Sequence, residues 1–164
     1  MSKIDLREYK KEIRAQMRKI RREMPPDVIR EKNDQIFRRL VATQQYRRAK
    51  TVVLYVSKEL EVDFGILEPN ENLPILHDTR DAICIVPAFC NDFRGYRVGY
   101  GGGYYDRYLS SFSGAKIGVN FSDCVRPRLI SGRYDVPVDL LVTDRYIRRC
   151  TQQKSGSRHR RTSK

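Results

Sequence analysis

The sequence predicts an α/β fold: three layers, with a mainly parallel, Rossmann-like sheet flanked by helices. Two amphipathic helical patterns fill about the first fifty residues, and short, continuously apolar runs of strand length follow them. A glycine cluster stands after one of these runs and directly before a further helical pattern. Strands separated by a helix in this way are typical of a parallel sheet covered by helices.

The first helix is predicted from apolar residues that recur in steps of three and four, at Leu6, Tyr9, Ile13, Met17, Ile20 and Met24. Pro25-Pro26 ends it, because proline cannot continue a helix. A second helix is expected to begin near Asp27, whose carboxylate can cap free N–H groups. Its inward side chains are expected to be Val28, Ile36, Leu40 and Val41.

The strands are predicted from apolar and β-branched runs. Thr51–Val56 is continuously apolar, which suits a strand covered on both faces. Prolines, Gly65 and asparagines predict a loop over Phe64–Asp78. The remaining elements are expected to be a buried strand at Ala82–Val86, a polar loop, a helix at Tyr104–Phe112 after the glycines, and strands at Ala115–Phe121 and Val138–Val142.

Length and composition predict one α/β domain over residues 1–150 and a basic, disordered tail over residues 151–164. The apolar runs are too short to span a bilayer, and the charged N-terminus lacks a secretory signal, so we expect a cytoplasmic protein without membrane contact. The four cysteines form no CxxC pair and are expected to be reduced and mostly buried.

The net charge of +13 is divided unevenly along the chain. It is +9 over residues 1–50, −1 over residues 51–150 and +5 over residues 151–164. The region expected to form the sheet is therefore neutral. This distribution argues against a nucleic-acid-binding core, although a salt-sensitive association through the tail stays open.

The glycine cluster Gly99, Gly101, Gly102 and Gly103 follows a strand and precedes a helix. Glycines let the backbone approach a phosphate closely, and the free N–H groups of the helix then face the anion. No Gly-Lys-Ser/Thr follows, and Tyr104 stands where a Rossmann motif has its third glycine. Spacing alone leaves a tight turn with positive φ as an equal alternative.

The residues around the glycines resemble the signature of the 5-formyltetrahydrofolate cyclo-ligase family: Val86-Pro87, Gly95 and the run Arg97–Leu109. Other segments agree in order and extend the resemblance from about Lys10 to about Arg145. They are Lys10–Arg14 with Arg21 or Arg22, Tyr55 through Glu61-Val62-Asp63, Phe64–Pro69 and Asp135–Thr143.

This resemblance implies ATP-dependent and Mg²⁺-dependent cyclisation of 5-formyltetrahydrofolate to 5,10-methenyltetrahydrofolate, with release of ADP and phosphate. ATP would phosphorylate the formyl oxygen, the neighbouring amine would close the ring, and phosphate would leave. The expected partners are 5-formyltetrahydrofolate and ATP, with the chain a monomer or a dimer. The alternative is a nucleotide-binding relative that has lost turnover.

The resemblance also implies the ATP site: Lys10, Arg14, Arg97, Gly99, Gly101, Gly102, Gly103, Tyr104 and Tyr105. On a helix, Lys10, Arg14 and Arg21 fall within about 40° of one another and form one cationic stripe. Arginine suits bidentate phosphate binding, which fits Arg97. The alternatives are a solvated helix face for the stripe, an exposed loop arginine for Arg97 and aromatic packing for the tyrosines.

For magnesium the resemblance implies Asp106 and Asp139, and for the folate substrate it implies Val56, Glu61, Tyr100 and Tyr104. A hard cation bridging ATP oxygens does favour one or two carboxylates. The alternatives are an acid stabilised by the helix dipole for Asp106 and an arginine-paired acid at a strand edge for Asp139.

The sequence departs from the family pattern after Asp63. The family normally has a helix, a strand and a hairpin-like segment there, whereas here Asp63 runs directly into Phe64. The fold is thus expected to be shortened, to lack part of the folate pocket wall and to leave a sheet edge that invites pairing with another chain.

Overall fold

A computed structural model describes residues 5–55, 57, 58, 60–65 and 78–150. The predicted strand end at Val56, most of the predicted loop at Phe64–Asp78 and the predicted disordered tail lie outside these residues. The helices are α1 (Leu6–Glu23), α2 (Pro26–Ala42), α3 (Gln44–Arg48) and α4 (Tyr104–Ser111), with a 3-10 turn η1 (Ser122–Cys124). The strands are β1 (Thr51–Val53), β2 (Ala82–Pro87), β3 (Cys90–Asp92), β4 (Arg97–Val98), β5 (Ala115–Asn120), β6 (Val125–Arg126), β7 (Leu140–Thr143) and β8 (Ile147–Arg149).

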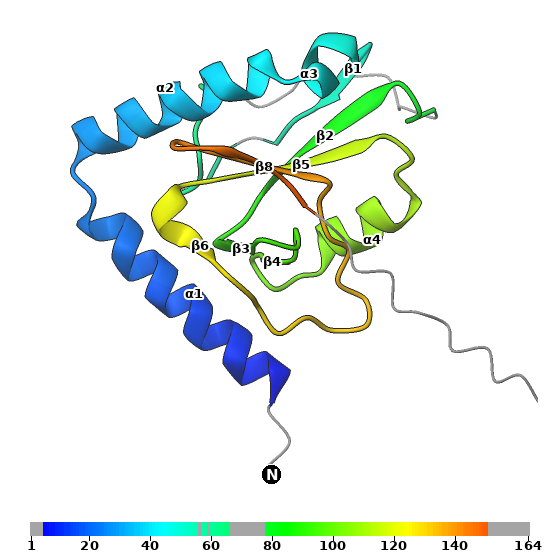
Figure 1. Cartoon of the computed structure of the whole chain (residues 1–164). Helices are drawn as coiled ribbons and strands as arrows, with labels where there is room; N and C mark the ends of the chain where they lie inside the picture. Colours follow the sequence, from blue (N-terminus) through cyan, green and yellow to red (C-terminus); the bar gives the residue numbers. More distant parts are fainter. Residues whose placement is uncertain (1–4, 56, 59, 66–77, 151–164) are drawn as a thin grey trace, which may run out of the picture.

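The main sheet has five strands in the order β1-β2-β5-β7-β8 (Figure 1). Neighbouring strands within this sheet are parallel, except for β7 and β8, which are antiparallel. The predicted α/β class and mainly parallel sheet are therefore confirmed.

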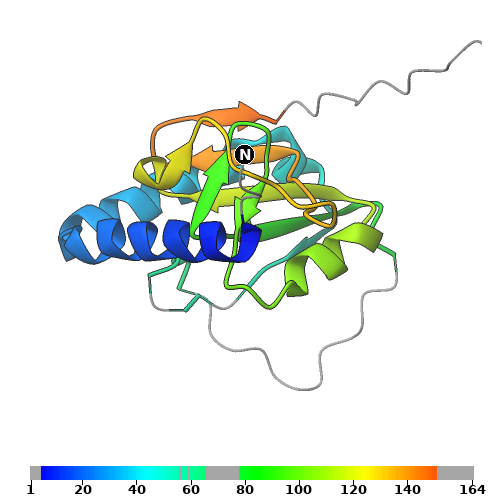
Figure 2. The same ribbon diagram turned by 90° about the horizontal axis from the view of Figure 1, so that it is seen from below.

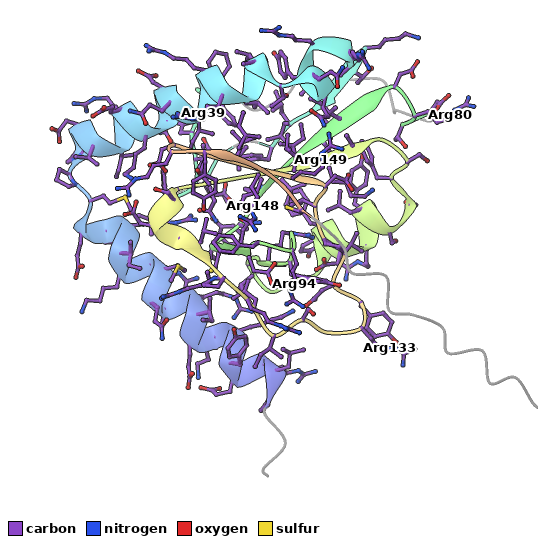
Figure 3. The ribbon with its side chains drawn as sticks, viewed as in Figure 1. Arg39, Arg80, Arg94, Arg133, Arg148 and Arg149 are labelled. Carbon is purple, nitrogen blue, oxygen red and sulfur yellow. The ribbon has the colours of Figure 1, made fainter. Side chains whose placement is uncertain are left out.

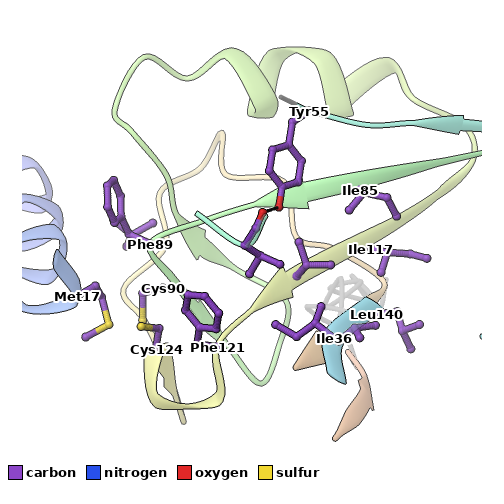
Figure 4. Packing of buried hydrophobic residues seen from close by; sticks show 14 of the residues in the cluster. Met17, Ile36, Tyr55, Ile85, Phe89, Cys90, Ile117, Phe121, Cys124 and Leu140 are labelled. Atoms are coloured by element: carbon purple, nitrogen blue, oxygen red, sulfur yellow. Dashed lines mark hydrogen bonds between the residues drawn. The ribbon is translucent and has the colours of Figure 1, made fainter. Parts of the chain in front are cut away.

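Side chains of the central strands alternate between two hydrophobic layers. On β2, Ile83 and Ile85 pack in the cluster that includes Met17 of α1 and Ile36 of α2 (Figure 4). The intervening Cys84 belongs to the second cluster, with the α4 residues. Helices thus cover both faces of the sheet, and α1 and α2 lie on the opposite side of the molecule from α4 in both views (Figures 1 and 2). This explains why the central strands are apolar without alternation.

The turn between α1 and α2 departs in one detail from the expected cap. Pro25 occupies the N-cap of α2 without a side-chain hydrogen bond, Pro26 is the first helical residue, and Asp27 lies in the first turn. Proline has its φ already set for a helix and no N–H to satisfy, so the helix begins two residues earlier than a cap at Asp27 would place it. Ile36 and Leu40 are buried as predicted.

The prediction of a first strand covered on both faces is wrong. β1 ends at Val53, its residues are exposed or partly buried, and Leu54 is exposed. The reason is its position, because β1 is the edge of the five-stranded sheet and pairs with β2 alone among the described strands. Hydrophobicity cannot distinguish an edge strand from a central one.

The predicted polar loop after β2 contains regular structure. β3 pairs with β4 and β6 in a second, three-stranded sheet, and its Cys90, Asn91 and Asp92 are all buried. β8 was also missed, because its three residues Ile147–Arg149 are exposed and carry no apolar pattern.

The described surface is rich in arginine. Figure 3 labels Arg39 on α2, Arg148 and Arg149 on β8, and Arg94 and Arg133 on loops. Exposed positive charge is therefore spread over several elements, and not only over α1. No helix among the described residues has the length and hydropathy needed to cross a membrane. All four cysteines are free and buried, as predicted.

Candidate functional site

The glycine turn joins β4 to α4. Gly101 has a φ of 106° and Gly103 a φ of 66°, a region that side chains with a Cβ disfavour. Gly103 is also the N-cap of α4 and brings no side-chain hydrogen bond to the helix. The first N–H groups of α4 thus receive no side-chain cap, which is the arrangement that favours an anion.

Arg14 of α1 lies against this turn. Its Nε donates to the carbonyl oxygen of Gly99 at 2.9 Å. A Cβ added at Gly101 would stand 3.2 Å from Nη2 of Arg14, so the guanidinium rests on the glycine backbone. The structure brings together Arg14 and the turn, as the sequence predicts for a phosphate site.

Lys10, one turn earlier on α1, is already engaged. Its Nζ contacts both carboxylate oxygens of Asp135, at 2.8 and 2.6 Å. The solvated-face alternative does not describe it, because this ion pair is partly buried. Its contact ties α1 to the loop that precedes β7.

Arg97 is buried, so the alternative of an exposed loop arginine is wrong. Its side chain is 4% exposed, Nη2 lies 2.8 Å from Oδ1 of Asp106, and Nη1 donates to the carbonyl of Val136 at 2.5 Å. Burial lowers the pKa of Arg97, while the nearby Asp106 acts in the opposite direction. These contacts fix the strand before the turn to the helix after it.

The two predicted metal ligands have different surroundings. Oδ1 of Asp106 accepts from Arg97 and from the N–H of Val136 at 3.0 Å, while its Oδ2 has no hydrogen bond among the described residues. Asp139 lies just before β7 and its Oδ2 accepts from the N–H of Lys116 at 2.8 Å. No group of three or more His, Cys, Asp or Glu within the described ranges could hold a metal ion. A Mg²⁺ site here would depend on phosphate oxygens and water for most of its ligands.

Glu61 and Tyr100, two predicted substrate residues, meet beside the turn. Glu61 is 7% exposed, and its Oε2 accepts from the N–H of Lys58 at 2.7 Å. Burial raises the pKa of Tyr100, and the nearby Glu61 carboxylate raises it further. The Tyr100 ring lies 4.6 Å from the ring of Phe89, between their centroids.

The neighbouring tyrosines differ in exposure. Tyr104 is 77% exposed, and the guanidinium of Arg107 lies 5.0 Å from its ring centroid. Tyr105 is partly buried, 6.0 Å from the guanidinium carbon of Arg97. Packing therefore accounts for Tyr105, whereas Tyr104 is available to a ligand. Val56 lies outside the described residues.

Sequence reasoning missed Phe89 and the role of Arg21. The sequence pattern places Arg21 on one cationic stripe with Lys10 and Arg14, but Arg21 is 1% exposed. The signal was its spacing, because it stands four residues after Met17, which itself stands four after Ile13, and all three face the core. Phe89 stands two residues after the end of β2, at the carboxyl end where parallel strands present site residues.

The fold places the chain in the class of α/β proteins with a mainly parallel sheet, and its glycine turn at a helix N-terminus is an arrangement that phosphate-binding members of this class share. The sequence model of the 5-formyltetrahydrofolate cyclo-ligase family matches residues 6–63 and 60–144. The chain belongs to that family, whose members are ligases of folate and one-carbon metabolism.

Individual relatives agree with this assignment. The chain is 31% identical over 103 aligned positions to the probable 5-formyltetrahydrofolate cyclo-ligase of Schizosaccharomyces pombe, and the match covers 55% of this chain and 46% of the relative. The match thus spans about half the length of that relative. The NMR structure of Aquifex aeolicus 5,10-methenyltetrahydrofolate synthetase is 27% identical, with a TM-score of 0.75 covering 94% of this chain and 99% of the other.

A second structure supports the fold alone. The 5,10-methenyltetrahydrofolate synthetase of Mycoplasma pneumoniae is 22% identical, with a TM-score of 0.66 covering 82% of this chain and 98% of the other.

Proposed function

We propose that this chain is an ATP-dependent and Mg²⁺-dependent ligase that cyclises 5-formyltetrahydrofolate to 5,10-methenyltetrahydrofolate. The observation that carries the proposal is the glycine turn itself. Gly99 of the turn accepts a hydrogen bond from Arg14, and Gly103 is the N-cap of α4. Tyr100 of the same turn lies near Glu61. A single turn is therefore shared by a site suited to phosphate and a site suited to an organic substrate.

In the proposed reaction the formyl oxygen attacks the γ-phosphorus of ATP and ADP leaves. The neighbouring amine of the folate then attacks the activated carbon, and that carbon's oxygen departs with the phosphate. Little covalent chemistry falls to the protein, so positioning and charge neutralisation must supply the rate enhancement. Arg14 and the N–H groups of α4 are suited to hold phosphate oxygens. Glu61 and Tyr100 are suited to orient the polar edge of the pterin.

Magnesium would supply charge neutralisation between the phosphates. Asp106 fits this ion, because its Oδ2 is free of hydrogen bonds from the described residues and its side chain is 29% exposed. Asp139 is a second proposed ligand, and its Oδ1 is likewise without a hydrogen bond in the described structure.

Another candidate function is a nucleotide-binding relative that has lost turnover. Two observations favour it. The family model matches in two segments that overlap at residues 60–63, and the resemblance leads us to expect further elements at this point, where Asp63 runs directly into Phe64. β1, the strand just before this junction, is the edge of the sheet. Both are consistent with a folate pocket that has lost part of its wall.

Oxygen labelling tests the proposed reaction directly. With 5-formyltetrahydrofolate carrying ¹⁸O in its formyl group, the released phosphate should contain one ¹⁸O atom, measured by mass spectrometry. Asp106→Asn should lower the rate of labelled phosphate release without changing the label content. Release of unlabelled phosphate alone would show that ATP is hydrolysed without activation of the formyl oxygen.

A further inference from the structure

Arg21 is a cation that the fold buries without a carboxylate. Its Nη2 donates to the carbonyl oxygens of Ala88 at 2.5 Å and Phe89 at 3.0 Å, and to Oδ1 of Asn120 at 2.7 Å. Its Nη1 donates to the carbonyl oxygen of Leu60 at 2.5 Å, and its Nε lies 3.5 Å from Sγ of Cys124. Among the described residues, no carboxylate forms an ion pair with it.

Such a charge is costly to bury, since an arginine stays protonated and must replace its water shell with protein dipoles. An apolar side chain would fill the same place beside Met17 at lower cost. The planar fork of arginine can join several fixed carbonyl groups at once. The arrangement is therefore suited to fixing the positions of separate segments.

The acceptors on the sheet lie at the carboxyl ends of its strands. Phe89 follows β2, and Asn120 is the last residue of β5. The Phe89 ring contacts Tyr100 of the glycine turn. Through the carbonyl of Phe89, Arg21 thus holds the backbone from which one wall of the candidate folate site extends.

The carbonyl oxygen of Leu60 is the most informative of these acceptors. Leu60 has a φ of 71°, and no other non-glycine residue in the described ranges has a positive φ. A leucine disfavours this conformation, so its surroundings must hold it there. The next residue is Glu61, whose carboxylate lies near the Tyr100 hydroxyl and accepts from the N–H of Lys58.

We propose that Arg21 is a positioning residue for the folate half of the site, a role that rests on the proposed function. By holding the Leu60 carbonyl it keeps Leu60 in its left-handed conformation and directs Glu61 toward Tyr100. By holding the Phe89 carbonyl it fixes the ring on which Tyr100 packs. Arg21 is buried and does not touch substrate.

Arg21→Lys tests this, because lysine keeps the charge but cannot bridge four oxygen acceptors. Hydrogen exchange should show the Glu61 amide, which donates to the Lys58 carbonyl at 3.0 Å, exchanging at least about tenfold faster, with the amides of α4 unchanged. Arg22→Lys, at the adjacent exposed position, is the matched control and should change neither the exchange of the Glu61 amide nor that of the α4 amides. If the lysine variant does not fold, Arg21→Gln repeats the test without a buried charge. Uniformly faster exchange would show a role in general stability alone and overturn the proposal.

Calorimetry then separates the two halves of the site. Arg21→Lys should raise the Kd of 5-formyltetrahydrofolate by about tenfold or more and that of Mg-ATP by less than about twofold. Adding Leu60→Gly should recover part of the folate affinity, because glycine adopts a φ of 71° without strain. Equal losses for both ligands, or a further loss on adding Leu60→Gly, would overturn the proposal. Wild-type protein that binds no 5-formyltetrahydrofolate would contradict the proposed function, and the exchange rates of Glu61 would still decide the role of Arg21.

Discussion

At the scale of single residues, the glycine turn offers a comparison within one motif. A Cβ at Gly101 would be strained by a φ of 106° and would press on the Arg14 guanidinium, whereas a Cβ at Gly99 would meet nothing within 4 Å. We therefore expect Gly101→Ala to lower the free energy of unfolding by about 1–2 kcal/mol and Gly99→Ala by less than about 0.5 kcal/mol. Chemical denaturation measures both, and equal losses would mean that the turn does not need its left-handed geometry.

Arg97 and Arg107 provide a second comparison. Arg97→Ala leaves the partly buried Asp106 without its ion pair, so we expect a loss of about 3 kcal/mol in unfolding free energy and weaker Mg-ATP binding. Arg107 is exposed on α4, and Arg107→Ala should change stability by less than about 0.5 kcal/mol and leave ATP binding nearly unchanged. Calorimetric losses of similar size for the two variants would show that general charge, and not the turn, holds the nucleotide.

The residue types at the site could be predicted from sequence, but their environments could not. The family resemblance indicated Arg14, Arg97 and Glu61. It could not show that Arg97 is buried in an ion pair or that Arg21 faces the core, because burial depends on which helix face meets the sheet. The four-residue spacing of Arg21 from Met17 is compatible with burial, but spacing alone does not distinguish a buried cation from one at the edge of the apolar stripe.

At the scale of elements, Asp144 joins three parts of the fold. It follows β7, accepts from the N–H of Ser122 in η1 at 2.6 Å, and lies 3.0 Å from Nζ of Lys32 in α2. Burial alone would raise the pKa of Asp144, but these hydrogen bonds outweigh it and hold the pKa below its ordinary value of 3.8. A carboxylate with a depressed folded pKa stabilises the fold above its unfolded pKa, and the effect is lost as pH falls through the folded value.

We therefore expect Asp144→Asn to lower the free energy of unfolding by about 3 kcal/mol at pH 7, because Lys32 loses its buried partner. The difference from wild type should shrink as pH falls below about 3.8. Asp123→Asn is the control, since Asp123 also contacts Lys32 but is 38% exposed, and it should cost less than about 1 kcal/mol. Denaturation at several pH values measures this, and a difference that does not depend on pH would contradict the assignment.

Elements with strong periodicity could be predicted, and short ones could not. The bounds of α1, α4 and β2 agree closely with the sequence patterns because each has a continuous apolar stripe or run. The strands β3, β4, β6 and β8 have two or three residues each, too few to establish a period. Their pairing depends on segments distant in sequence.

At the scale of the whole molecule, the glycine turn and the junction Asp63–Phe64 lead to different expectations for Mg-ATP and for 5-formyltetrahydrofolate. The turn, α4 and Arg14 are all present, so Mg-ATP should bind with ordinary affinity for the family. At 100 times its Kd it should stabilise the fold by about 2.7 kcal/mol, raising Tm by roughly 5–10 °C. Thermal melts with and without Mg-ATP measure this, and no shift at saturating nucleotide would remove the ATP site.

For 5-formyltetrahydrofolate we expect weaker binding than in a family member that has the elements expected after Asp63. Losing on the order of 100 Å² of apolar pocket wall at roughly 25 cal/mol per Å² would cost about 2.5 kcal/mol, nearly two decades in affinity. Titration calorimetry measures this affinity. Ordinary affinity would mean that other residues replace the missing wall.

The most direct test of the proposed activity is the formation of methenyltetrahydrofolate by the purified protein, followed by absorbance. With saturating 5-formyltetrahydrofolate, ATP and Mg²⁺, the product should accumulate. Omitting any one of the three should abolish its formation, and Asp106→Asn should lower the rate by at least about tenfold. No product from a folded protein that binds Mg-ATP would contradict the proposed ligase activity and would leave a nucleotide-binding relative without turnover.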